Sequence, residues 1–243
     1  MRRRPLYFLP CLIGVFLFFF LMNVIASRKR KRATLSIHQL ATWAETGDVV
    51  LFSSSPRHYM SSLATRAGSG REWTHVGVLY IHDGVPYVFE TGLPDNERTD
   101  PYGVVDLLTG VRYKSGVVLL PLAEKLRAYE GYAVVRRLED KPAFPGLRGF
   151  FEEYSRFVYP SIFWTGFAGF AERLSIFGGG DPGVIRRLLN KEGAPICSEL
   201  TALLYQRYGI LSEGKPAYVF LPHNFSGEFV GRCRVRDEVE IEE

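Results

Sequence analysis

The sequence predicts an α+β domain of about 200 residues that follows one apolar N-terminal segment. Two observations predict the domain: short apolar strands separated by turn signals, and amphipathic stretches with helix-capping residues at their ends. A third observation, the apolar run Leu6–Ala26 between two basic clusters, predicts the N-terminal segment. We therefore divide the chain into a basic and apolar segment over residues 1–32, a domain over 33–236 and an acidic tail over 237–243.

Residues 6–26 are long enough to cross a bilayer as a helix, because a hydrocarbon core is about 30 Å thick. The basic residues on both flanks fit a membrane surface better than a nucleic-acid surface. We expect a single-pass anchor in the lipid bilayer and no nucleic-acid partner. A cleaved secretory signal is the alternative, because Ser27 follows the small-residue motif Val24-Ile25-Ala26. Since both flanks are basic, the side of the membrane that holds the domain stays open.

The first part of the domain is predicted to hold one short helix and three strands. Ser36–Thr46 has apolar residues at helical spacing, and Ser36 is its N-cap. Asp83-Gly84 is a hairpin-turn signal that joins the second strand to the third. The expected strands are Val49–Phe52, Thr74–Ile81 and Val85–Thr91.

The second part of the domain is predicted to combine further strands with helices. The expected strands are Val104–Leu108, Val117–Pro121 and Tyr132–Leu138, and the expected helices are Leu122–Glu130 and Cys197–Tyr208. Residues 141–192 form an aromatic-rich, helical insertion. Its aromatic residues fit core packing, or an apolar wall for a lipid-like substrate or the bilayer. The acidic tail is expected to be frayed.

Cys197 is predicted to begin a helix. A helix N-terminus presents unpaired amides and a partial positive charge, and both favour a thiolate over a thiol. The same amides can bind a developing oxyanion. Cys11 lies in the apolar segment and Cys233 is expected to be a small buried residue, so no disulfide framework is present. Cys and His residues do not cluster at metal-ligand spacing, so the sequence predicts no metal site.

His75 and Glu90 are expected to share one face of a β-hairpin. A two-residue turn at Asp83-Gly84 pairs Gly77 with Glu90 and makes His75 a diagonal neighbour of Glu90, about 7–8 Å away. The glutamate can then accept a hydrogen bond from one ring nitrogen and leave the other for a thiol. Of the other histidines, His38 and His82 are poorly placed for this role, and His58 and His223 stay open as alternatives.

These residues, taken in order, resemble the motifs of the permuted papain-like amidases. That group comprises circularly permuted relatives of the NlpC-type cysteine peptidases and includes YiiX-like bacterial proteins. The histidine precedes the cysteine in the chain, which is the permuted order. The resemblance covers roughly residues 36–225, with 141–192 unmatched. The motifs that carry it are Gly47–Phe52, Thr74–Val78, Glu90 and Cys197–Leu200.

The resemblance implies a small antiparallel sheet packed on the cysteine helix. It implies Cys197 as nucleophile, His75 as its base and Glu90 as the polar partner of that base, without a metal or organic cofactor. Asp48 is expected to cap backbone amides, and Glu199 is expected to have a structural or pocket-edge role.

The expected activity is thiol-dependent cleavage or acyl transfer on an amide or ester, through an acyl-enzyme. The anchor favours a lipid-linked or acylated substrate. One alternative is a catalytically idle binding or scaffold protein that uses the same fold at the membrane. Another is a membrane structural protein whose motifs match by chance.

Overall fold

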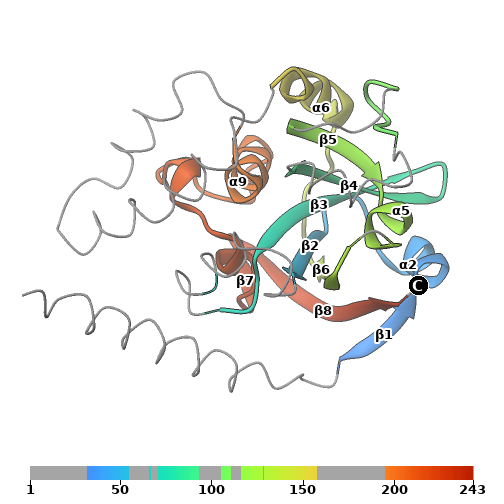
Figure 1. The fold of residues 1–243 in the computed structure, drawn as a ribbon. Coiled ribbons are helices and arrows are strands. Elements are labelled where there is room, and N and C mark those ends of the chain that lie inside the picture. Colours follow the sequence, from blue (N-terminus) through green and yellow to red (C-terminus); the bar gives the residue numbers. More distant parts are fainter. Residues whose placement is uncertain are drawn as a thin grey trace, which may run out of the picture.

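The computed structural model describes residues 32–54, 66, 71–92, 105–110, 116–127, 129–157 and 195–242. They form an α+β domain built on one eight-stranded sheet (Figure 1). The predicted anchor over residues 6–26, Cys11, His58 and most of the 141–192 insertion lie outside these residues. In the part of the chain that the structure describes, no helix is long and apolar enough to cross a membrane.

The strand order in the sheet is β1-β8-β6-β2-β3-β4-β5, with β7 paired to β8. The strands are β1 (Ala33–Ser36), β2 (Val49–Ser54), β3 (His75–His82), β4 (Val85–Gly92), β5 (Gly116–Pro121), β6 (Gly131–Leu138), β7 (Phe229–Val230) and β8 (Cys233–Glu242). The α-helices are α2 (Ile37–Trp43), α5 (Leu122–Arg127), α6 (Leu147–Ser155) and α9 (Cys197–Arg207). Two 3-10 helices follow α9: η1 (Ala217–Val219) and η2 (Pro222–Phe225). Cys233 is fully buried, as expected.

The sheet is larger than the small antiparallel sheet that the resemblance implied. All neighbouring strands are antiparallel except β1 and β8, which are parallel. The extension arises at one edge, where β8 pairs with β6 and then with β1. Both added strands come from the ends of the domain: β1 directly follows the basic flank that ends at residue 32, and β8 runs into the predicted acidic tail.

Residues 237–242 belong to β8 and are not a frayed tail, so that expectation was wrong. Val239 pairs with Val135 of β6 and is 5% exposed, and Ile241 is 8% exposed. Acidic residues fill the alternate positions on the other side of the strand. Apolar and acidic residues therefore alternate with a period of two, as in a strand with one buried face. The acidic composition of the segment obscured this pattern in the sequence.

The strand predicted over Val104–Leu108 is replaced by a bridge residue at Val105 and a turn over 107–109. Asp106 is 3% exposed, and its carboxylate accepts hydrogen bonds from the N–H groups of Leu108 and Leu119 at 3.2 and 2.9 Å. It also accepts one from the Thr109 hydroxyl at 2.7 Å. An aspartate that bonds nearby backbone amides offers the chain an alternative to a strand ladder.

The sheet separates two apolar layers. Helices α6 and α9 cover one face, and α2 and α5 cover the other (Figure 1). In β3, Val76 and Val78 point into the first layer, and Leu79 points into the second. Because both faces are covered, the central strands β2 and β3 are almost continuously apolar.

Asp48 has the structural role that the sequence predicts. It is fully buried, and its carboxylate accepts from the N–H groups of Glu45 at 2.8 Å and Leu138 at 3.1 Å and from Nζ of Lys141 at 2.6 Å. Burial raises the pKa of Asp48, although the charge of Lys141 opposes this shift. The residue therefore joins the turn before β2 to the end of β6.

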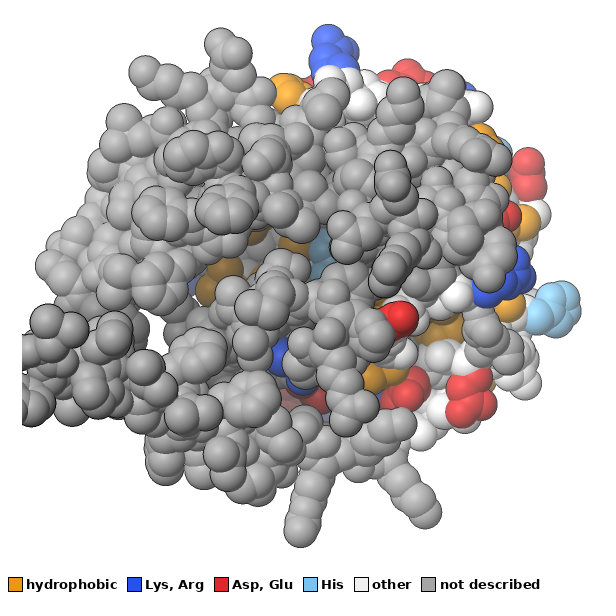
Figure 2. All heavy atoms as spheres, viewed as in Figure 1, with side chains coloured by type: hydrophobic (Ala, Val, Ile, Leu, Met, Phe, Trp, Pro, Cys, Tyr) orange, Lys and Arg blue, Asp and Glu red, His pale blue; other side chains and the backbone are white. Residues whose placement is uncertain are grey.

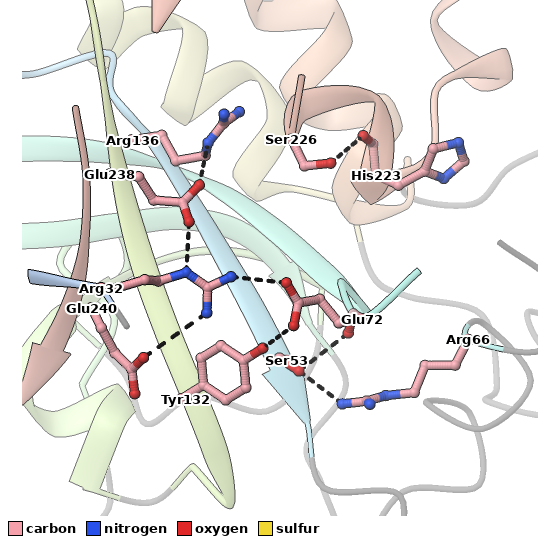
Figure 3. A network of polar contacts seen from close by, with 10 residues as sticks. All are labelled: Arg32, Ser53, Arg66, Glu72, Tyr132, Arg136, His223, Ser226, Glu238 and Glu240. Atoms are coloured by element: carbon pink, nitrogen blue, oxygen red, sulfur yellow. Dashed lines mark hydrogen bonds and ion pairs between the residues drawn. The ribbon is translucent and has the colours of Figure 1, made fainter. Parts of the chain in front are cut away.

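Arg32, which closes the basic run, lies inside the domain with a side chain that is 8% exposed. Its guanidinium donates to Glu238 at 2.6 Å and to Glu72 at 2.8 Å (Figure 3). It also lies over the rings of Trp73 and Tyr132, at 5.1 and 5.5 Å from their centroids. These contacts attach the start of the domain to the residues directly before β3.

The described surface carries charges of both signs. Figure 2 shows acidic, basic and hydrophobic side chains interspersed along the right-hand rim of this face. The exposed large hydrophobic residues of the described part are Val85, Val105, Leu107, Val219 and Phe229. Val105 and Leu107 share the 105–110 segment, and the other three come from separate elements. Scattered apolar residues of this kind are usual on globular surfaces.

Candidate active site

The hairpin of β3 and β4 has the register predicted from its turn. Asp83 and Gly84 have φ angles of 49° and 75°, as a two-residue turn with both residues in the left-handed region requires. The pairs run from His82 with Val85 to Val78 with Phe89. This register places His75 and Glu90 on the same face of the sheet.

The side chains of His75 and Glu90 are in direct contact. Nε2 of His75 lies 2.8 Å from Oε2 of Glu90, whose side chain is 0% exposed. The carboxylate is an acceptor, so Nε2 carries the ring proton in this contact. Nδ1 is then the ring nitrogen left for the thiol of Cys197, and the two side chains shift each other's pKa. The structure thus brings together the three residues that were singled out from the sequence.

Cys197 is the first residue of α9 and is partly exposed. The backbone N–H groups of Val76 and Ser198 and the imidazole of His75 all lower the pKa of its thiol. The N–H of Ser198 belongs to the first turn of the helix, where amides have no partner within the helix. The helix start therefore supplies the donors for negative charge that the sequence predicts.

The charges of the three side chains shift one another's pKa values in the direction opposite to the effect of burial. Burial lowers the pKa of His75, but the charges of Cys197 and Glu90 and the hydrogen bonds to both raise it from 6.5 to about 10. Burial raises the pKa of Cys197, but pairing with His75 and two backbone N–H bonds bring it below 9.0. Both shifts favour the thiolate–imidazolium form of the pair, and the thiolate is the nucleophilic form of a cysteine.

Lys125 is a fourth member of the site, which the sequence does not reveal. Its Nζ lies 2.6 Å from Oε1 of Glu90, the oxygen that does not face His75. Burial raises the pKa of Glu90, but the charges of Lys125 and His75 lower it overall from 4.5 to about 2. The contact depends on how α5 folds against β4, so no local pattern around Lys125 indicates it.

Gly77 leaves room on β3 for the contact between His75 and Glu90. A Cβ at this position would lie 2.6 Å from Cγ2 of Val88, 2.9 Å from the carbonyl oxygen of Phe89 and 3.4 Å from Cβ of Glu90. The first two distances are too short for any side chain. Gly77 therefore allows β4 to approach β3 closely at the point where Glu90 meets His75.

The remaining candidates lie elsewhere or outside the described residues. The Glu199 carboxylate accepts from the N–H of Ile196 at 3.4 Å and caps the start of α9, in keeping with its expected structural role. His38 is exposed on α2, and His82 lies at the hairpin turn beside Asp83. His223 lies in η2. The imidazole bonded to Cys197 in the described part of the chain is that of His75.

Comparisons with known proteins find likenesses among solved structures. No family model matches the chain, and neither does any curated protein. The chain is similar to the crystal structure of the metalloprotein YiiX from Escherichia coli O157:H7, with a TM-score of 0.41 and 19% identity over 81% of this chain and 88% of that chain. The likeness concerns the fold alone. Within the described residues, no group of three or more His, Cys, Asp or Glu side chains is placed to hold a metal ion.

Proposed function

We propose that this protein is a cysteine hydrolase or acyltransferase that acts on an amide or ester. One observation supports the proposal above all: Nε2 of His75 lies 2.8 Å from the fully buried carboxylate of Glu90, and the same imidazole interacts with the thiol of Cys197 and lowers its pKa. A nucleophile, its base and a group that orients the base are the parts that acyl transfer requires.

In the first half of the proposed reaction, the Cys197 thiolate attacks the carbonyl carbon, and the carbonyl electron pair moves to the oxygen. We assign the stabilisation of this oxyanion to backbone amides of the first turn of α9. When the tetrahedral intermediate collapses, the imidazolium of His75 gives its Nδ1 proton to the departing amine or alcohol. The acyl group remains on sulfur as a thioester.

In the second half, neutral His75 removes a proton from water or from another acceptor, which attacks the thioester carbonyl. The carbon–sulfur bond breaks, and the sulfur leaves as a thiolate beside the imidazolium, so the starting state returns. Glu90 stays ionised throughout and keeps the imidazole oriented. Water as the acceptor makes the protein a hydrolase, and another nucleophile makes it a transferase.

The substrate class that we propose is a lipid-linked or acylated amide or ester. The support for it is the apolar run over residues 6–26, which would hold the site beside a bilayer as a single-pass anchor. A membrane-bound site meets lipid-linked substrates at a far higher local concentration than soluble ones.

The nucleophile is tested with a fluorescent vinyl sulfone probe and with p-nitrophenyl acyl esters as reporter substrates. We expect labelling and turnover by the full-length protein in detergent. Cys197→Ala should abolish labelling and reduce turnover by at least about a thousandfold. Cys233→Ser is the matched control, because that thiol is 0% exposed, and it should retain both signals.

Two results would contradict the proposal. Labelling that persists in Cys197→Ala would place the reactive thiol elsewhere. A Cys197 that titrates at the ordinary value of about 8.5 and supports no turnover would favour an idle binding protein with the same fold.

A further inference from the structure

Four ionisable side chains from four elements form one chain of contacts. Cys197 of α9 bonds to His75 of β3, His75 to Glu90 of β4, and Glu90 to Lys125 of α5. In the ion-pair state their charges alternate as negative, positive, negative and positive. Glu90 is 0% exposed and Lys125 is 16% exposed, so solvent screens this pair weakly.

No other charged group in the described part of the chain competes with Lys125 for the outer oxygen of Glu90. Strand β5, which pairs with β4, has no ionisable residue. The hydroxyl of Tyr129 is within 2.6 Å of the Ser54 hydroxyl instead. The remaining ionisable residues of α2 and α5 are exposed: His38, Glu124 and Arg127.

We propose that Lys125 acts as a fixed positive charge behind Glu90 and so sets the pH window of the thiolate–imidazolium pair. The geometry supports this role. The Nζ–Oε1 contact of 2.6 Å leaves only Oε2 of Glu90 free to meet the imidazole. The ammonium is also held over aromatic rings, at 5.8 Å from the centroid of Phe52 and 6.0 Å from that of Tyr129.

The charge of Lys125 acts on its neighbours in a known direction. A nearby positive charge favours the deprotonated form of every group, so its removal raises the pKa of Cys197, His75 and Glu90 together. Removal of the Glu90 charge does the opposite at His75, because an imidazolium without a carboxylate loses its proton more readily. Lys125→Met and Glu90→Gln should therefore move the His75 titration in opposite directions. A lysine that only supports the fold would produce no such opposition.

The experiment compares Lys125→Met, Lys125→Arg and Glu90→Gln in full-length protein carrying Cys233→Ser. The Cys197 thiolate is followed by its ultraviolet absorbance against pH, and the His75 imidazole by NMR. We expect Lys125→Met to raise both midpoints by about one pH unit. Glu90→Gln should lower the His75 midpoint, and Lys125→Arg should leave both midpoints near their wild-type values because the charge remains.

Lys125→Gln provides a second neutral variant in case Lys125→Met does not fold, since its amide can still donate to Glu90. Arg127→Met is the matched control on the same helix, and we expect no shift because Arg127 is exposed. Unchanged midpoints in both neutral variants, or midpoints that move with those of Glu90→Gln, would overturn the inference.

The role of Lys125 in catalysis rests on the proposed function, but the two titrations that test it do not require turnover. The two titrations report on the pair whether or not a substrate is found. Shifted midpoints without turnover in any variant would sink the proposed function and leave the role of Lys125 standing. Turnover with unshifted midpoints would support the proposed function and overturn the role of Lys125.

Discussion

Nε2 of His75 lies 2.8 Å from Oε2 of Glu90, and the two residues belong to neighbouring strands of one hairpin. The proposed base and its proposed orienting group are therefore placed by a single local element. Only Cys197 has to be brought in from far along the chain, and α9 does so by beginning at that residue. The site is assembled from one hairpin and one helix start, with Lys125 behind the carboxylate.

The first prediction concerns the reactivity of the thiol. Because pairing with His75 lowers the pKa of Cys197, alkylation by iodoacetamide should already be fast below the ordinary thiol pKa. His75→Ala removes the imidazolium, and the alkylation profile should move up toward a midpoint of about 8.5 or above. The measurement is the alkylation rate against pH in a Cys233→Ser background. Identical profiles for the two proteins would contradict the pairing.

The second prediction concerns Glu90 and acid stability. Its pKa is about 2 in the folded protein against an ordinary value of 4.5. A lowered pKa stabilises the fold above the unfolded value and loses this effect as the pH falls through the folded value. The contribution of about 3 kcal/mol should therefore be complete above about pH 4.5 and disappear toward pH 2.

Urea unfolding of wild type and Glu90→Gln from pH 7 down to pH 2 measures this contribution. The free energies of unfolding should differ at neutral pH and converge as the solution becomes acidic. Glu152→Gln is the control, since that carboxylate is 58% exposed and bonds to Arg148, which is also exposed. A Glu90→Gln difference that stays constant with pH would mean that the carboxylate is not ionised in the fold.

The positions of His75 and Glu90 relative to each other could be predicted from the sequence because short-range signals determine them. The Asp83-Gly84 turn sets the register, and the register sets which residues share a face. The end of α9 is equally local, because Gly209, with a φ of 68°, follows the helix.

Lys125 and the outer strands depend instead on contacts between distant segments. Lys125 reaches Glu90 across 35 positions in sequence, and nothing near either residue indicates the other. Strand β1 pairs with β8 from the opposite end of the chain. The basic run that ends at Arg32, just before β1, and the acidic residues of β8 indicated a flank and a tail. In the sheet, Arg32 pairs with Glu240 of β8, and Glu238 of β8 pairs with Arg136 of β6.

The third prediction tests the space around Gly77. Gly77→Ala would place a methyl group 2.6 Å from Val88 and 2.9 Å from a backbone oxygen of β4, so β4 has to move. We expect a loss of about 1–3 kcal/mol in the free energy of unfolding, and a loss of turnover as Glu90 shifts away from His75. Gly149→Ala in α6 is the control, since a methyl group there meets nothing within 4 Å. That change should stabilise the helix by up to about 1 kcal/mol, and an equal effect of both substitutions would refute the steric account.

The fourth prediction concerns residues 6–26. As a bilayer anchor they should keep the protein in the membrane fraction after alkaline carbonate extraction, and a chain that starts at Ser27 should be released. N-terminal sequencing of the mature protein separates the two interpretations of this segment. A native N-terminus at Ser27 would establish a cleaved signal and exclude the anchor.

The fifth prediction concerns Arg32, whose guanidinium bridges Glu238 of β8 and Glu72, three residues before His75. Arg32→Met leaves two partly buried carboxylates without this partner, and we expect a loss of about 2 kcal/mol in the free energy of unfolding. Because Glu72 precedes the strand that carries the base, turnover should fall as well, with the midpoints of the Cys197 and His75 titrations unchanged. Arg236→Met is the matched control, since its side chain is 56% exposed and 3.9 Å from its partner Glu139, and it should cost less than about 0.5 kcal/mol. Urea unfolding of both variants decides the matter: equal losses would mean that the Arg32 bridge behaves as an ordinary surface ion pair and does not order the approach to β3.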